Sequence, residues 1–183
     1  LSQVSLRKQA LPLLETLRND CKETVHLAIL DRMEVVYLEK LEGLLPIGFM
    51  SSRVGGRAPA YCTGVGKALL AYEASHEVRS FFPKHGLKRY TANTIVDVEE
   101  LLAELTEVTN RGFAIDNEEH EIGVKCVAAP IRDHQGEVIG AISVSGPVQR
   151  MDEKIAETDL VSKVINTSRE ISARLGYSVS GRS

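Results

Sequence analysis

The chain has 183 residues, of which 43% are hydrophobic and 26% are charged, and its formal net charge is −3. These values predict one globular domain, with room for a short appendage. The slightly acidic balance argues against a main nucleic-acid surface on this segment, because phosphate binding favours a basic face. No apolar run reaches the roughly 18 residues of a membrane span, and three widely separated cysteines are typical of free thiols in the cytoplasm.

The N-terminal third predicts a helix followed by a β-hairpin. Four apolar residues share one helical face: Leu6, Ala10, Leu13 and Leu17. Pro12 interrupts this pattern, so we expect it to kink the helix or to begin its main part. Strands are expected over residues 24–30 and 34–41. Residues 44–52 are expected to form a third strand or a bent segment, and residues 53–57 a loop.

Residues 58–71 predict a bend, a glycine turn and the opening of a helix over about residues 66–73. Thr63 is a candidate N-cap, and Gly64 and Gly66 leave the backbone uncovered by side chains. The first N–H groups of a helix have no acceptor within it, so this turn is a candidate site for a small anion. No evident catalytic residues surround it, which indicates sensing rather than chemistry.

The second half predicts further helices and stronger strands. One helix is expected over residues 75–82, ending before Pro83, and another over about residues 152–175. Asp97 is a candidate N-cap for a helix that runs to about Asn110, with Gly112 just past its end. The strands are expected over residues 112–116, 124–131 and 138–145. A tight turn at residues 133–136 joins the last two strands. Residues 87–94 are expected to be irregular, and the tail from residue 176 to be disordered.

Alternation along the last strand predicts two faces. One face is expected to hold Ile139, Ala141, Ser143 and Ser145. The other is expected to hold Val138, Gly140, Ile142 and Val144. Because hairpins dominate, we predict an α+β domain with a largely antiparallel central sheet flanked by helices.

Several segments resemble those of IclR-family transcriptional regulators, in the same order. They are residues 23–30, 34–40, 57–71, 111–119, 123–131 and 142–147. The resemblance implies a GAF-like or profilin-like effector-binding domain, which in the family follows a winged helix-turn-helix domain and a linker helix. Residues 1–19 would then be the linker helix and domain entry, 20–176 the effector-binding domain and 177–183 a tail. We expect the DNA-binding domain to lie outside this chain.

The resemblance also implies a ligand pocket. The backbone N–H groups of Gly64 and Val65 would hold an oxygen of the ligand, in agreement with the anion site predicted above. The polar side chains at the family's ligand positions are Asp116, Cys126, Ser143 and Ser145. The apolar wall positions are Ile47, Met50, Ala58 and Val124.

Ordinary structural roles are open for the same residues. Asp116 is also suited to capping a turn before Asn117, and Cys126 to being a buried, inert thiol. The two serines could pair with backbone or water, and the apolar wall residues could belong to any core. Arg53 and Arg57 flank the turn, but loop arginines are usually solvated, so a multiply charged ligand is disfavoured.

The function expected from the resemblance is that of a regulator, such as a repressor, rather than an enzyme. A small organic acid would bind this domain, and a homodimer or homotetramer would bind operator DNA through the separate domain. No cofactor, no metal and no membrane contact are expected.

The alternatives are a ligand-free dimerisation module, a Cys/His-dependent enzyme and a metal site. The enzyme has no recognised signature and would pair Cys62 or Cys126 with one of four histidines: His26, His85, His120 or His134. The metal site would use Asp116, Glu118, Glu119, His120 and Cys126, which lack a recognised ligand spacing.

Overall fold

A computed structural model describes residues 2–48 and 50–179. Its strands are β1 (Thr24–Asp31), β2 (Glu34–Leu41), β3 (Arg57–Pro59), β4 (Ala114–Asn117), β5 (Val124–Arg132) and β6 (Val138–Pro147). Its helices are α1 (Gln3–Cys21), α2 (Gly64–Leu70), α3 (Ser75–His85), α4 (Val98–Arg111), α5 (Val148–Glu157) and α6 (Leu160–Arg174). None of the helices in the described part of the chain is long and apolar enough to cross a membrane.

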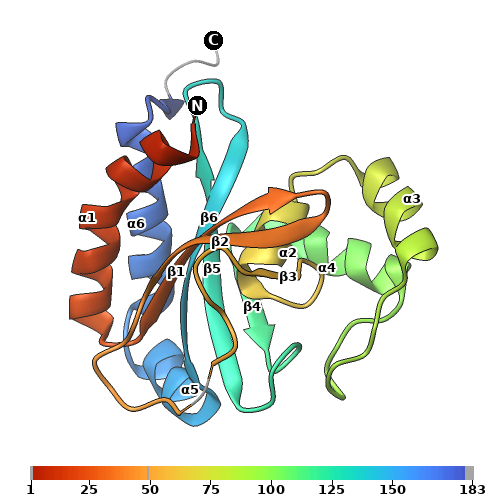
Figure 1. Cartoon of the computed structure of the whole chain (residues 1–183), viewed down its shortest axis with the longest axis horizontal. Helices are drawn as coiled ribbons and strands as arrows, with labels where there is room; N and C mark the ends of the chain where they lie inside the picture. The colour runs from red at the N-terminus through yellow and green to blue at the C-terminus, as the bar shows by residue number, and fades with distance from the viewer. Residues whose placement is uncertain (1, 49, 180–183) are drawn as a thin grey trace.

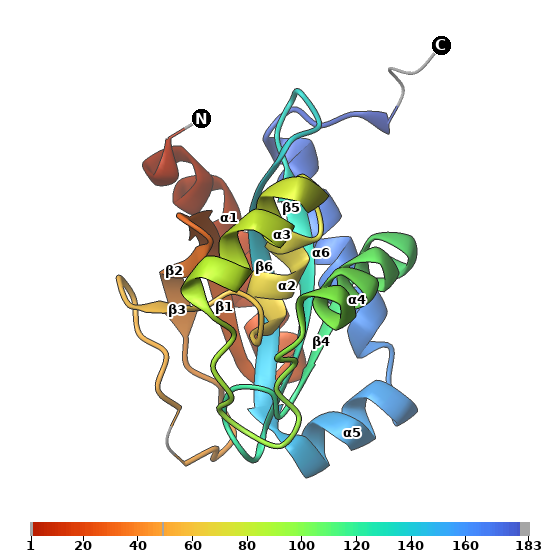
Figure 2. The same cartoon turned by 90° about the vertical axis from the view of Figure 1, so that its right-hand side faces the viewer.

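The six strands form one antiparallel sheet in the order β3-β2-β1-β6-β5-β4, with helices on both faces (Figure 1). This confirms the predicted α+β fold. One hydrophobic cluster lies between the sheet and α1, α5 and α6, and a second lies between the sheet and α2, α3 and α4. With α3 and α4 toward the viewer, Figure 2 shows α2 between them and the strands.

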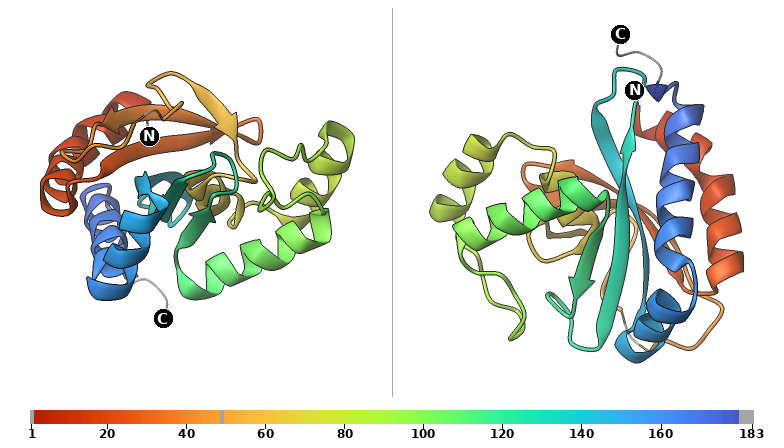
Figure 3. Two further views of the ribbon diagram at one scale, coloured as in Figure 1. Left: turned by 90° about the horizontal axis from the view of Figure 1, so that it is seen from below. Right: turned by 180° about the vertical axis from the view of Figure 1, so that it is seen from behind.

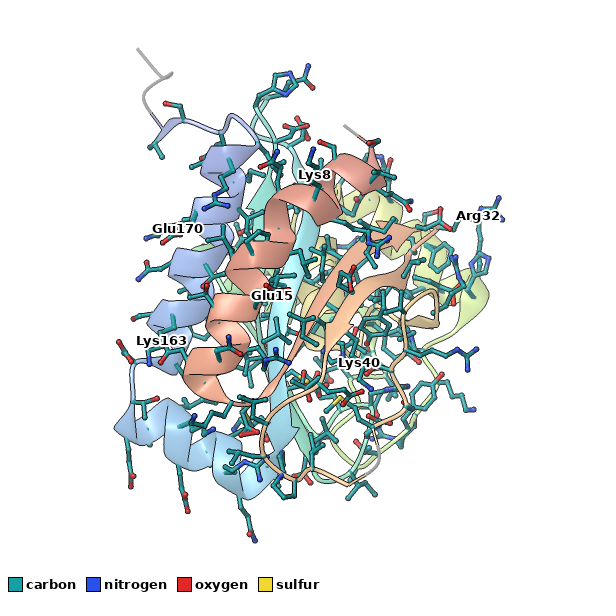
Figure 4. All side chains as sticks on the ribbon, turned by 60° about the vertical axis from the view of Figure 1, so that its left-hand side comes forward. Lys8, Glu15, Arg32, Lys40, Lys163 and Glu170 are labelled. Atoms are coloured by element: carbon teal, nitrogen blue, oxygen red, sulfur yellow. The ribbon has the colours of Figure 1, made fainter. Side chains whose placement is uncertain are left out.

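Helix α1 packs beside α6 on the sheet, as the views from below and behind also show (Figure 3). Its inner face is part of the core, while charged residues such as Lys8 and Glu170 lie on the outer surfaces of the two helices (Figure 4). The helix continues through Pro12. Burial of Leu6 and Leu14 against the sheet outweighs the backbone hydrogen bond that proline removes.

Local sequence signals set several of the element ends. The β1–β2 hairpin turns at Arg32 and Met33, which have φ values of 52° and 62°, as a two-residue turn with matching twist requires. The side chain of Asp97 accepts hydrogen bonds from the first N–H groups of α4, and Gly112 ends that helix at a φ of 85°. These features were predicted correctly.

Four elements differ from the sequence prediction. Residues 44–48 and 50–52 contain no strand, so of the two predicted forms the bent segment is the one found. Arg57–Pro59 forms a short edge strand where a loop was expected to end, and α3 continues through Pro83 to His85. The single C-terminal helix is two helices, because Thr158 is extended (φ −125°, ψ 176°). The break lets both α5 and α6 place apolar residues against the sheet.

The predicted faces of β6 are correct from residue 140 onward and reversed before it. Ile131 pairs with Gly140 and Arg132 pairs with Val138, so Ile139 is an extra residue in this strand. Such a bulge moves the preceding side chains to opposite faces. Val138 therefore packs beside α2, and Ile139 packs on the α1 side.

The expected tail lies partly in the described residues. There the N–H of Tyr177 donates to the carbonyl of Ser172, over 2.9 Å. Residues 180–183 lie outside the described residues.

Candidate ligand pocket

A cavity of about 200 Å³ lies between the sheet, the start of α2 and residues 50–56, which we call the cover segment. It is lined by His26, Tyr37, Met50, Ser51, Ser52, Arg53, Gly56, Arg57, Ala58, Thr63, Gly64, Val65, Asp116, His120, Glu121, Val124, Cys126, Ser143 and Ser145. Nine of the ten residues expected at a ligand pocket are therefore brought together. Ile47 is not among the lining residues.

The floor of the cavity is a polar row across three strands. Asp116 on β4 pairs in register with Cys126 on β5, and Cys126 pairs with Ser145 on β6. Directly opposed residues in antiparallel strands have their side chains on one face, about 5 Å apart. The Ser145 hydroxyl donates a hydrogen bond to the Cys126 sulfur over 2.9 Å. Strand pairing therefore explains how residues distant in the sequence share this floor.

The start of α2 forms one end of the cavity. Thr63 is its N-cap, since its Oγ1 accepts from the Gly66 N–H over 3.2 Å and its carbonyl accepts from the Lys67 N–H over 2.9 Å. The N–H groups of Gly64 and Val65 have no acceptor among residues 2–48 and 50–179. They are consequently free to bind an acceptor in the cavity.

Glycine at position 64 lets the helix start approach the floor closely. A Cβ atom there would lie 3.2 Å from the Cβ of Cys126 and 3.3 Å from that of Ala128. Both distances are tighter than ordinary van der Waals contact. The absence of a side chain thus places the backbone donors directly over the polar row.

Asp116 caps a turn and also lines the cavity. Its Oδ1 accepts from the Glu119 N–H over 2.8 Å, and the side chain is almost fully buried. Burial and the nearby Glu119 carboxylate raise the pKa of Asp116 to about 7. Both roles considered for this residue are therefore present in the structure.

The basic side chains of Lys67, in α2, and Arg57, at the cavity, are paired with carboxylates of the protein. Lys67 is 1% exposed, and its Nζ lies 2.9 Å from Glu119 Oε1 and 3.1 Å from Glu104 Oε1. Arg57 lines the cavity, but its guanidinium pairs with Asp31 and Glu34. The positive charges of Lys67 and Arg57 are thus balanced by carboxylates of the same chain.

The sequence did not indicate six of the polar lining residues as ligand-pocket residues, although two of the histidines were considered for an enzyme or a metal site: His26, Tyr37, Ser51, Ser52, His120 and Glu121. His26 is 3% exposed, and its Nε2 lies 2.7 Å from Ser52 Oγ. Burial, together with the positive charge of Lys40, lowers the pKa of His26 to about 3, so the ring is neutral. Alternation along β1 predicts two faces, but only pairing with β6 turns the His26 face toward the cavity.

The site does not have the features of a metal centre or a thiol enzyme. Within the described ranges, no group of three or more His, Cys, Asp or Glu side chains is placed to hold a metal ion. Burial raises the pKa of both the Cys62 and Cys126 thiols, whereas a nucleophilic cysteine needs a lowered pKa. The donors and acceptors that line the cavity are suited to binding a small molecule through hydrogen bonds.

Comparisons with known proteins bear on the family and the fold of the chain. The family model described as bacterial transcriptional regulator IclR C-terminal matches residues 1–173. The HTH-type transcriptional regulator KdgR of Escherichia coli is 39% identical over 156 residues, which are 85% of this chain and 59% of that protein. The chain thus spans about three fifths of the length of this curated relative, which is named as a regulator rather than an enzyme.

Solved structures give the same result. The crystal structure of the Thermotoga maritima IclR protein has a TM-score of 0.86 and 38% identity, and covers 94% of this chain and 69% of that chain. An IclR homolog from Microbacterium hydrocarbonoxydans, complexed with 4-hydroxybenzoate, has a TM-score of 0.83 and 29% identity. The match to that complex covers 96% of this chain and 70% of that chain.

Proposed function

The chain belongs to the IclR family of bacterial transcriptional regulators, whose C-terminal domain it contains, and from this we propose that its pocket is a sensor site for a small organic acid. Binding of the acid would change how the regulator binds operator DNA. DNA contact would be made by a part of the regulator outside this chain.

The observation that carries this proposal is the pair of free N–H groups at Gly64 and Val65, which meet the cavity at a helix start. A carboxylate there would gain two charge-assisted hydrogen bonds and the favourable end of the helix dipole. The nearby Lys67 and Arg57 are paired with carboxylates of the protein. Arg53 also lines the cavity and has no ion pair among the described residues, so the two N–H groups suit one carboxylate and a second negative charge on the ligand would have to be met by Arg53.

The polar row would hold the other end of the ligand. Ser143 carries a hydroxyl donor, the Ser145 hydroxyl hydrogen is taken up by the Cys126 sulfur, and Asp116 is an acceptor when ionised. A ligand hydroxyl or carbonyl group fits such a set, with Met50, Ala58 and Val124 as apolar walls. The related homolog complexed with 4-hydroxybenzoate supports this class, because that ligand carries one carboxylate and one hydroxyl.

Regulation would follow from a shift between subunit arrangements. A homodimer or homotetramer matches the symmetry of a repeated operator site. The ligand would favour one arrangement by its differential affinity for the two, and this difference limits the size of the response.

A thermal-shift screen against glyoxylate, pyruvate, sugar acids and hydroxybenzoates tests the proposal. A dose-dependent rise in melting temperature is expected for at least one acid, because a ligand of the native state stabilises it. Ser143→Ala with Ser145→Ala should weaken that response, and Val65→Pro should abolish it by removing a donor. Ser162→Ala, on the exposed side of α6, is the matched control.

The alternative function is a ligand-free dimerisation module. No shift with any acid, in protein shown to be folded, would favour that alternative. A shift that the serine and Val65 variants leave unchanged would place the ligand elsewhere and refute the pocket.

A further inference from the structure

His26 occupies the centre of a hydrogen-bonded chain that joins the cover segment to the floor of the pocket. On one side, its Nε2 lies 2.7 Å from Ser52 Oγ in the cover segment. On the other side, its Nδ1 lies 3.3 Å from Ser143 Oγ and 3.4 Å from Ser145 Oγ. Because His26 pairs with Ser143 across β1 and β6, this position is fixed by the sheet.

The donor and acceptor of each of these hydrogen bonds can be deduced from the bond between Ser145 and Cys126. Ser145 has one hydroxyl hydrogen, and it is donated to Cys126 Sγ. The Ser145 oxygen can therefore only accept from His26, which requires the hydrogen of the neutral ring to be on Nδ1. Nε2 is then an acceptor, so Ser52 must donate to it.

We propose that His26 is a positioning residue held as the Nδ1–H tautomer, and that it makes Ser143 a hydrogen-bond donor toward the ligand. Ser143 accepts from the same Nδ1–H, and its own hydroxyl hydrogen has no acceptor among the described residues. The pocket floor therefore selects an oxygen acceptor, such as a carbonyl, hydroxyl or carboxylate oxygen, and disfavours an ammonium or amide N–H at this point. This selectivity rests on the proposed sensor function, whereas the tautomer does not.

The same ring anchors the cover segment. Ser52 contributes its hydroxyl to His26, and its carbonyl accepts from Lys40 Nζ over 2.7 Å. The preceding residue, Ser51, donates its backbone N–H to Glu121 Oε1 over 3.0 Å, and its hydroxyl has no partner among the described residues. A ligand that accepts a hydrogen bond from Ser143 would thus bind at one end of this series of hydrogen bonds, and the cover segment is held at the other end through Ser52.

The tautomer is measured directly by long-range ¹H–¹⁵N NMR on the ¹⁵N-histidine-labelled domain without ligand, at about pH 8. The His26 signals are identified by their loss in His26→Gln. A protonated Nδ1 and an unprotonated Nε2 are expected. The Nε2–H tautomer or a doubly protonated ring would overturn the proposal, whatever the thermal-shift screen shows.

Hydrogen exchange tests the anchoring role. Ser52→Ala removes the hydroxyl that donates to Nε2, so exchange of the cover-segment N–H groups should become about tenfold faster, as expected for the loss of one hydrogen bond of about 1.4 kcal/mol. His26→Asn keeps a donor near the Nδ1 position but cannot reach Ser52, and should give a similar increase. Ser51→Ala, whose hydroxyl has no partner in the described residues, is the matched control. Equal exchange in all three variants would contradict the anchor.

Discussion

Replacing Asp116 with asparagine should stabilise the domain increasingly as the pH rises. The Asp116 carboxyl is buried, and burial with the Glu119 carboxylate raises its pKa from 3.8 to about 7. A group with a raised folded-state pKa binds more protons in the folded than in the unfolded protein. The contribution of Asp116 to stability is therefore fully present below pH 3.8 and is lost as the pH rises through about 7. Asparagine keeps an acceptor for the Glu119 N–H and carries no charge.

The size of the effect follows from the two pKa values. One pKa unit is worth about 1.4 kcal/mol, so a shift of about 3 units has a limiting value of about 4 kcal/mol. Between about pH 5 and about pH 8.5, ionisation of Asp116 lowers the free energy of unfolding of the unmodified domain by about 2–3 kcal/mol. The free energy of unfolding of Asp116→Asn, relative to the unmodified domain, should rise by that amount over this range.

Urea denaturation at a series of pH values measures this difference. His26, whose lowered pKa makes stability rise with pH between about 3 and 6.5, is present in both proteins and cancels. Asp152→Asn is the control, since it removes the same charge from an exposed ion pair with Lys125, worth about 1 kcal/mol at most. Parallel stability curves for Asp116→Asn and the unmodified domain would refute the buried, proton-binding carboxyl.

Three further results are expected from the structure. Lys67→Met should cost about 3–5 kcal/mol of unfolding free energy in urea denaturation, because it leaves the buried Glu119 carboxylate without its cation; a loss below 1 kcal/mol would contradict the ion pair. Gly66→Ala should cost about 3 kcal/mol or more, since the new Cβ would lie 2.1 Å from the Ala60 carbonyl oxygen, and a variant that melts at the original temperature would show that this turn can move. Because burial raises the pKa of all three thiols, a thiol reagent at about pH 8 should label none in the folded domain and all three after denaturation; rapid labelling of the folded protein would disprove their burial.

The sequence alone predicted the features that depend on near neighbours. Thr63 caps a helix start, Asp97 caps α4 and Gly112 ends it, because capping is decided by side chains within three or four positions. The antiparallel α+β fold followed from the hairpins and the alternation of the strands. The family resemblance added candidate pocket residues that spacing alone could not have brought together.

The tertiary structure decided which of these residues meet and how they are bonded. The row of Asp116, Cys126 and Ser145 depends on the pairing of three strands, and the bulge at Ile139 reverses one end of β6. His26 became a candidate only when the cover segment placed Ser52 against its ring. Strand register and loop position are set by contacts between residues far apart in the chain, and local sequence patterns do not reveal the free energy of such contacts. These contacts bring the glycine turn at the start of α2 and the polar residues of the strands together in one pocket.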